Sequence, residues 1–262
     1  MTDKTTKLFS SELNKHLYPI LADDYFNTTR IGAYDLATMR TIVRENIKPI
    51  KDNNNLNILD WGCGNSLWAF GLFPRAFITG VDLSEDNLKY SKINAKENAS
   101  KFRGLLFDRD ISKLSENAFD HAISIALIEF LNEEMFNFIF SKIYNSLRPG
   151  AKLFVTHHNY RLFSAVYIPW ILRGGYPALK KRLGMDIQKK NTKDVISDFQ
   201  NIGYIYIDSG GFNPYPCKIW PLVFSNIGYR VRNSLIKDWY SAQYIVLQKP
   251  EVDNNTIKGY ES

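Results

Sequence analysis

Apolar positions near the start of the chain recur at helical spacing. In residues 33–47, AYDLATMRTIVRENI, those that fall on one face are Leu36, Met39, Ile42, Val43 and Ile47. The stretch 48–57, KPIKDNNNLN, then breaks the periodicity with a proline and a run of asparagines. We therefore expect a helical N-terminal cap over residues 1–50, followed by a boundary loop.

Beyond residue 50, short apolar runs alternate with amphipathic segments. Runs of strand character cover residues 57–62, 76–84, 102–111, 118–127, 151–158, 204–210 and 242–250. Segments of helical spacing cover residues 66–74, 84–99, 132–147 and 192–204, the second of them with Ser84 as its N-cap. Such alternation is typical of an α/β fold in which helices cover both faces of a parallel sheet.

This second unit is expected to form one domain over residues 51–250. Two stretches inside it, at about 159–190 and 212–238, interrupt the alternation and are rich in Tyr, Trp, Phe and Arg. Residues 251–262, EVDNNTIKGYES, are expected to form a loose tail.

The composition is typical of a globular protein and gives little support for binding to nucleic acid or to a membrane. Hydrophobic residues make up 45% of the 262 positions and aromatic residues 14%, which is enough to build a core. The net charge of +6 comes partly from residues 179–194, LKKRLGMDIQKKNTKD. We interpret this stretch as a solvated face; contact with nucleic acid or an anionic membrane surface is the less favoured alternative.

The cysteines and the first residues point to a reducing compartment. Only Cys63 and Cys217 are present, without the paired spacing of a disulfide framework or a zinc site. The N-terminus lacks a signal-type apolar stretch, and the apolar run 162–172 is too short to span a bilayer. We expect a soluble, cytoplasmic protein.

The turn after the first predicted strand carries the clearest chemistry. NILDWGCGNS places Asp60 at the strand end, followed by Gly62 and Gly64. Glycines there let the backbone bend sharply and approach a ligand without a Cβ in the way. The second strand ends in Asp82, about twenty residues after Gly62, where a carboxylate can accept both hydroxyls of a ribose.

Two details of this turn argue against a nicotinamide dinucleotide. The dinucleotide fingerprint has its third glycine where this chain has Leu67. Asp60 would also repel a pyrophosphate, whereas its negative charge suits a ligand that carries an amino group and a sulfonium.

Five motifs in order resemble the class I S-adenosylmethionine-dependent methyltransferases. After NILDWGCGNS come GVDLS, FDRDISKL, ENAFDHAISIALIEFL and IYNSLRPGAKLFVTHH, which are similar to successive motifs of that family. The resemblance covers roughly residues 55–160 and resumes in the closing strands. It implies a Rossmann-like, seven-stranded, mostly parallel sheet with helices on both faces and an antiparallel last strand, and S-adenosyl-L-methionine as cofactor.

The resemblance also implies roles for residues of this chain. The methionine part of the donor would be lined by the turn that contains Asp60, Gly62, Cys63 and Gly64, with Cys63 as an unreactive small residue. Asp82 would bind the ribose and Leu83 would pack against the adenine. The adenine edge and the pocket floor would be formed by Asp110, Ile111, Ile125, Ala126 and Leu127.

Three positions depart from the family pattern or extend it. Ser66 stands where the family has its third glycine, which puts that backbone contact in doubt. Asp108 competes with Asp110 for the adenine amino group, and Asp110 is favoured by its spacing to the next strand. Tyr25 and Arg30, ahead of the first strand, are expected to close over the donor.

Methyl transfer from a sulfonium mainly requires alignment of the acceptor and exclusion of water. A base is needed only where the acceptor loses a proton, and His157 and His158 at the end of the fifth strand are the catalytic candidates. Neighbouring strand residues point to opposite faces, so at most one of them is catalytic; both could instead only hydrogen-bond in the loop. His121 is interpreted as structural.

In the resembling family, segments added to the shared core set the acceptor. Here these would be residues 8–50, 159–190 and 212–238, whose aromatic residues and cations suit a flat or amphiphilic small molecule or merely cap the core. No hard-oxygen cluster follows the fifth strand, so no metal is expected. The sequence likewise lacks the motifs of DNA-amino and protein-arginine methyltransferases.

We therefore predict a methyltransferase for a small-molecule acceptor, with oxygen favoured over nitrogen and carbon. One alternative is a lipid- or quinone-directed enzyme whose segments 162–172 and 180–193 rest on a membrane surface. Others are a non-catalytic scaffold that binds S-adenosylmethionine and an RNA methyltransferase. Nucleic acid is a less favoured partner, and the oligomeric state is not predicted.

Overall fold

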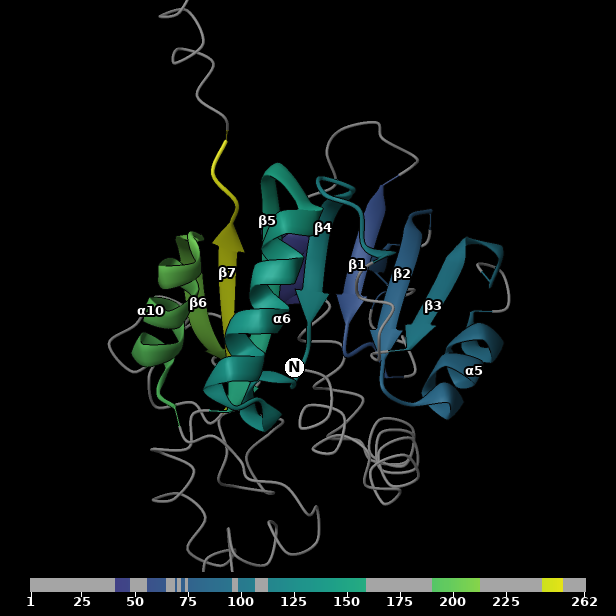
Figure 1. Cartoon of the computed structure of the whole chain (residues 1–262), viewed down its shortest axis with the longest axis horizontal. Helices are drawn as coiled ribbons and strands as arrows, with labels where there is room; N and C mark the ends of the chain where they lie inside the picture. The colour runs from purple at the N-terminus through teal and green to yellow at the C-terminus, as the bar shows by residue number, and fades with distance from the viewer. Residues whose placement is uncertain are drawn as a thin grey trace, which may run out of the picture.

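A computed structural model describes nine segments of the chain, which form one sheet flanked by helices (Figure 1). The described residues are 41–47, 56–64, 69, 72–73, 75–95, 99–106, 113–158, 190–212 and 242–251. The strands are β1 (Asn57–Trp61), β2 (Phe77–Asp82), β3 (Phe102–Leu106), β4 (Phe119–Ser124), β5 (Leu147–His158), β6 (Ile205–Phe212) and β7 (Ala242–Gln248). The helices are α5 (Glu85–Asn94), α6 (Glu133–Ser146) and α10 (Thr192–Ile202), with 3₁₀ turns η1 (Ala99–Lys101) and η3 (Ile128–Phe130). Residues 41–46 are also helical.

The seven strands follow the order β3-β2-β1-β4-β5-β7-β6. Strands β1 to β5 pair in parallel, whereas β7 runs antiparallel to both β5 and β6. The predicted sheet, including its antiparallel last strand, is therefore confirmed. β7 is inserted between β5 and β6, a placement that the sequence pattern did not reveal.

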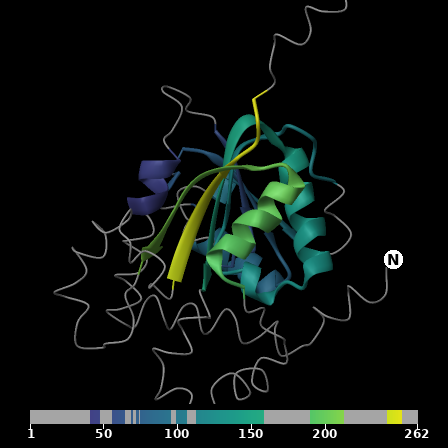
Figure 2. The same cartoon turned by 90° about the vertical axis from the view of Figure 1, so that its left-hand side faces the viewer.

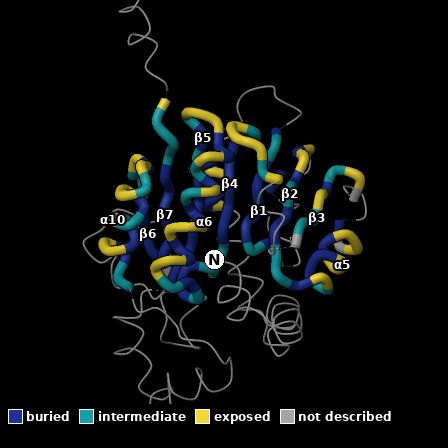
Figure 3. The backbone as a smooth tube through the Cα atoms, in the orientation of Figure 1, coloured by how far each residue is buried: buried dark blue, intermediate teal, exposed yellow. Residues whose placement is uncertain are grey.

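Two clusters of buried apolar residues pack on the sheet, and its central strands are buried along most of their length (Figure 3). On one face, Leu153 and Val155 of β5 join a cluster with α6 and α10. On the other, Phe154 packs with Ile42 and other residues of a second cluster. Figure 2 shows the helix at 41–46 on the opposite side of the sheet from α6 and α10. The predicted helices on both faces are thus confirmed.

Polar caps begin the helices where the sequence places them. Ser84 Oγ accepts a hydrogen bond from the Asn87 amide at 3.2 Å, which confirms it as the N-cap of α5. Asn132 and Asn191 cap α6 and α10 in the same way. α10 ends at Gly203, whose φ of 114° is the left-handed conformation that commonly ends helices.

Two element boundaries differ from the sequence prediction. β5 begins at Leu147, four residues earlier than the expected start at residue 151, because Leu147 pairs with Phe119 of β4. A register shift between Phe119 and His121 and a φ of +78° at Gly150 accommodate the proline-glycine pair inside this strand. α5 ends at Asn94, five residues before the expected end at residue 99.

Candidate functional site

The strand order reverses between β1 and β4, so the loops after these two strands diverge at the carboxyl edge of the sheet. Ligands of open α/β folds bind at such a switch point. The turn after β1, the end of β2 and the loop after β4 all lie at this edge. Of the residues assigned to the donor from the sequence, those that the structure describes therefore lie at one edge: Asp60, Gly62, Cys63, Gly64, Asp82, Leu83, Ile125 and Ala126.

The turn after β1 is a backbone cradle. Gly62 and Gly64 have φ angles of +73° and +52°, which L side chains rarely adopt. The amides of Gly62 and Cys63 both donate to the Val81 carbonyl of β2, at 2.8 and 3.1 Å. Among the described residues, no atom lies within 4 Å of where a Cβ at position 64 would stand. The turn therefore presents open backbone to a ligand.

Two side chains beneath this turn hold its shape. Cys63 is buried, and its Sγ lies 2.9 Å from the Cβ position of Gly80, so it fills the space that this glycine leaves. Ser91 of α5, also buried, donates from Oγ to the Gly64 carbonyl at 3.0 Å. Ser91 was not singled out from the sequence, because it bonds to a residue 27 positions earlier in the chain and no local pattern marks such a contact.

Asp60 lies at the last but one position of β1 and is only 2% exposed. In the described part of the chain its Oδ2 atom has no hydrogen-bond partner. Burial, and secondarily the negative charge of Asp82, raises the pKa of Asp60 to about 8. A buried carboxylate of this kind is a ready partner for a cationic ligand group.

Asp82 ends β2 and is bound to the same turn. Its Oδ2 accepts the Gly64 amide at 2.8 Å, and its Oδ1 accepts from the Ser84 amide at 2.9 Å and from Asn87 Nδ2 at 3.1 Å. Burial raises the pKa of Asp82, although these hydrogen bonds favour the carboxylate. Leu83 follows it and is partly exposed at the same edge. Asn87, a further residue that the sequence analysis did not single out, fixes the carboxylate plane.

The loop after β4 lies against the glycine turn. Ile125 packs on the core cluster that contains Ile42. Ala126 has a φ of +51° and donates its amide to Thr156 Oγ1 at 2.9 Å. Leu127 reaches the glycine turn, with its methyl carbons 3.4 Å from the Cβ position of Gly62.

The histidine pair ends β5. His157 is 3% exposed and pairs in register with Gln243 of β7, and His158 pairs with Ala242. Strand alternation places the His157 side chain on the same sheet face as Val155, toward α6 and α10. Tyr25, Arg30, Asp110 and Ile111 lie outside the described residues, as do Asp108 and nearly all of both insertions.

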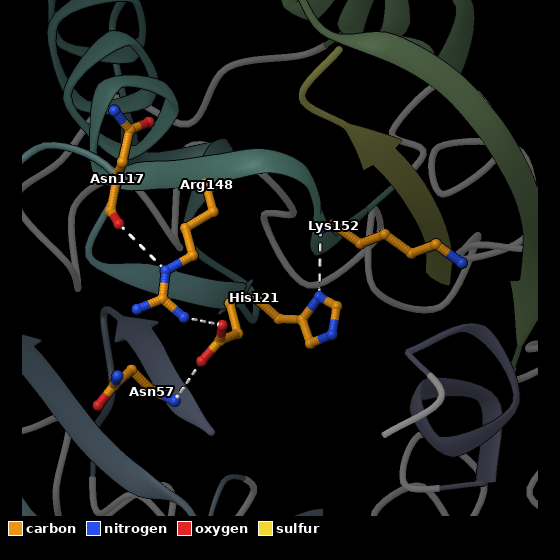
Figure 4. Close-up of polar contacts among 6 residues, drawn as sticks. Asn57, Asn117, His121, Arg148 and Lys152 are labelled. Atoms are coloured by element: carbon orange, nitrogen blue, oxygen red, sulfur yellow. Dashed lines mark hydrogen bonds and ion pairs between the residues drawn. The ribbon is translucent and has the colours of Figure 1, made fainter. Parts of the chain in front are cut away.

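A second polar cluster lies at the other end of the strands, near the amino ends of β1 and β4 (Figure 4). Asp120 accepts the Asn57 amide at 2.8 Å and pairs with the Arg148 guanidinium. His121 Nδ1 accepts the Lys152 amide at 3.2 Å, and burial lowers the pKa of His121 to about 4. A neutral histidine that accepts a backbone hydrogen bond is structural, as the sequence analysis expected.

Two further features of the described residues bear on the site. No three of their His, Cys, Asp and Glu side chains gather closely enough to hold a metal ion. None of their helices has the length and apolar character needed to cross a membrane.

Comparison with known proteins matches this architecture. A family model described as "Methyltransferase domain" matches residues 52–203. The chain is 26% identical over 161 residues to a ubiquinone biosynthesis O-methyltransferase of Pelagibacter ubique, which covers 57% of this chain and 65% of the relative. It is 35% identical over 112 residues to a malonyl-[acyl-carrier protein] O-methyltransferase of Priestia megaterium, covering 41% and 39%. The matches therefore span less than two thirds of each relative's length.

The fold also matches solved structures. A Haemonchus contortus phosphoethanolamine N-methyltransferase 2 in complex with S-adenosyl-L-methionine superposes with a TM-score of 0.62 at 16% identity. This match covers 95% of this chain and 61% of that chain. At such identity the likeness concerns the fold.

Proposed function

This chain belongs to the methyltransferase-domain family, and from this premise we propose that it transfers a methyl group from S-adenosylmethionine to an oxygen atom of a small-molecule acceptor. The observation that carries the donor assignment is the buried Oδ2 atom of Asp60, which has no hydrogen-bond partner among the described residues. Asp60 lies just before two glycines of positive φ, and no atom of the described residues lies within 4 Å of where a Cβ of the second, Gly64, would stand. These groups fit a ligand with a cationic methionine part.

The proposed donor contacts divide between two strands. Asp60 and the turn from Gly62 to Gly64 would hold the methionine part, whose ammonium and sulfonium would favour the carboxylate form of Asp60 over its neutral acid. Asp82 would hold the ribose, because its carboxylate ends β2 beside the same turn. S-adenosylmethionine supplies the activated methyl group, so the chain's own residues chiefly align the acceptor and exclude water.

The acceptor side rests on the loop after β4 and on the end of β5. Oxygen is favoured as the accepting atom because both curated relatives are named O-methyltransferases. A hydroxyl acceptor must lose a proton, and we assign this step to one of the two histidines at the end of β5, His157 or His158. Of the two, His157 points to the face of Val155 and His158 lies at the next position of the strand.

Isothermal titration calorimetry of the full chain with S-adenosylmethionine and S-adenosylhomocysteine tests the donor assignment. We expect both ligands to bind. If neither bound, the proposal that this chain is a methyltransferase would be wrong. A panel of phenols, quinols, carboxylic acids and amines, followed by S-adenosylhomocysteine release, tests the accepting atom. Turnover with amines alone would replace oxygen by nitrogen.

A second candidate is a quinone-directed enzyme, which the name of one relative favours. We propose that such an enzyme would work at a membrane surface, on the evidence of two segments of the sequence. In this version the apolar segment 162–172 and the basic segment 180–193 would contact lipid. Co-sedimentation with vesicles that contain an anionic lipid at low salt tests it. No binding under these conditions would remove the membrane version and leave the soluble acceptor.

A further inference from the structure

The residue that leaves β4 has an unusual backbone conformation. Ala126 has a φ of +51°, in the left-handed region that residues other than glycine seldom occupy. Of the described residues, only Asn117 shares this property among the non-glycines. Asparagine tolerates the conformation through its short polar side chain, whereas alanine has no such aid. An external contact must therefore favour it at Ala126.

Thr156 of β5 supplies that contact. Its Oγ1 atom accepts the Ala126 amide at 2.9 Å, and Thr156 is only 4% exposed. The last paired residues of β4 and β5 are Ser124 and Val155, so Thr156 lies one position beyond the end of the parallel ladder. Its hydroxyl therefore satisfies an amide that a longer β4 would have bonded to a backbone carbonyl.

The conformation of Ala126 sets the direction of the next residue toward the donor turn. Leu127 carries its Cδ1 and Cδ2 atoms to 3.4 Å from the Cβ position of Gly62. A continuous set of contacts thus runs from Thr156 through Ala126 and Leu127 to Gly62.

We propose that Thr156 is a positioning residue for donor binding: its hydroxyl holds Ala126 in the left-handed conformation and thereby keeps Leu127 packed on Gly62. This inference rests on the proposed function, because it concerns the pocket assigned to S-adenosylmethionine. Thr156 touches neither Gly62 nor the open face of Gly64 in the described contacts and acts through the loop after β4.

The inference is tested with Thr156→Val, which keeps the branched shape and removes the acceptor, and with Thr156→Ser, which keeps the acceptor. The dissociation constant of S-adenosylhomocysteine, measured by calorimetry, should rise roughly five- to tenfold for Thr156→Val and stay within about twofold for Thr156→Ser. Thr192→Val is the matched control. Thr192 is also buried, but its Oγ1 has no hydrogen-bond partner among the described residues and lies at the start of α10. This control should bind the donor product as the parent protein does.

Ala126→Gly separates positioning from a general loss of stability. Glycine adopts a positive φ without support, so Ala126→Gly should raise the affinity of Thr156→Val by more than it alters the affinity of the parent. Equal affinity of Thr156→Val and the parent would overturn the inference. So would an effect of Ala126→Gly that is the same in both backgrounds, since the two positions would then be uncoupled.

Hydrogen exchange of the Ala126 amide can be measured on the unliganded parent protein. This test remains possible even if Thr156→Val does not fold. We expect protection close to that of the β4 ladder amides; exchange at the rate of an open loop would overturn the inference. A parent that shows this protection but binds no S-adenosylhomocysteine would overturn the proposed function and, with it, the donor role of Thr156. A parent that binds while Thr156→Val binds equally well overturns the inference alone.

Discussion

Asp60 lies in an environment that disfavours the charged form of its carboxyl group. Its carboxyl is buried and stands near Asp82, and both effects favour the neutral acid, so its pKa is raised to about 8. In a chain without ligand this is a cost, because water would solvate the carboxylate better than the protein does. Residues that store such a cost are characteristic of binding sites, where the ligand removes it.

The first prediction concerns stability. The unfolded carboxyl titrates near 3.8 and the folded one near 8, so between these values the folded chain keeps a proton that the unfolded chain has released. The contribution of Asp60 to folding therefore falls as pH rises through this window, by at most about 1.4 kcal/mol per pH unit. Asp60→Asn should thus gain stability over the parent, increasingly from pH 5 to pH 8, in urea unfolding. A difference that does not change with pH would contradict the raised pKa.

The second prediction concerns the proton that donor binding displaces. At pH 7 Asp60 is mostly protonated in the free chain, and the ammonium group of S-adenosylhomocysteine, which carries no sulfonium charge, favours the Asp60 carboxylate. S-adenosylhomocysteine should therefore bind more tightly as pH rises toward about 8, with release of a proton. Calorimetry at pH 7 in two buffers of different ionisation enthalpy measures this release. Asp60→Asn should bind more weakly and release none; a buffer-independent enthalpy for the parent would sink the assignment.

The third prediction places the ribose. Asp82→Ala should weaken donor binding by about tenfold or more, as the loss of a charged hydrogen-bond acceptor does. Asn87→Ala is the control, because it removes only one of the contacts that orient the Asp82 carboxylate. Its effect on calorimetric affinity should be smaller. Unchanged affinity in Asp82→Ala would mean that the ribose lies elsewhere.

Between elements, one glycine permits the packing of β2 under the donor turn. A Cβ at Gly80 would lie 2.5 Å from a ring carbon of Phe102 in β3 and 2.9 Å from Cys63 Sγ. Both neighbours are themselves buried, so neither can move freely. The absent side chain of Gly80 is what lets the turn settle against the second strand.

The fourth prediction follows from this packing. Gly80→Ala should lower the free energy of unfolding by roughly 1–3 kcal/mol through overpacking and should also weaken donor binding, because Cys63 must shift within the turn. Gly104→Ala is the comparison: its Cβ would meet Phe102 and Leu88 at 3.2 and 3.3 Å, away from the turn. It should cost less stability and leave affinity unchanged. If Gly80→Ala and Gly104→Ala lost affinity equally, the packing of Gly80 against Cys63 would not be what shapes the turn.

The sequence predicted those features of the fold and the candidate site that depend on residues close together in the chain. Ser84 marks the start of α5 because a serine cap needs only its own helix. The glycine turn and Asp82 were found for the same reason, as neighbours in sequence. The insertion of β7 between β5 and β6 and the contact from Thr156 to Ala126 depend on pairings between distant strands. No local pattern records such pairings, and an alanine carries no sign of a left-handed φ.

In the sheet as a whole, the proposed binding residues lie at the carboxyl ends of the strands, and a polar cluster that stabilises the fold lies at their amino ends. The residues that we propose for donor binding lie at the carboxyl ends of β1 and β2, whereas Asp120, near the amino end of β4, links β1 and β5 (Figure 4). The Asp120 side chain is 5% exposed and the Arg148 side chain 47%, so the carboxylate is the buried member of the pair. The two ends should respond differently to substitution.

The fifth prediction tests that separation. Asp120→Ala leaves the Asn57 amide and the Arg148 guanidinium without their shared acceptor, so the free energy of unfolding should fall by about 2 kcal/mol. Because the donor turn is at the other end of β1, the affinity for S-adenosylhomocysteine should stay within about twofold of the parent. Urea unfolding and calorimetry on the same preparation measure both, with Asp82→Ala as the converse variant that loses affinity. A large loss of affinity in folded Asp120→Ala would show that strain at the amino edge reaches the glycine turn through β1, and that the two ends of the sheet are coupled.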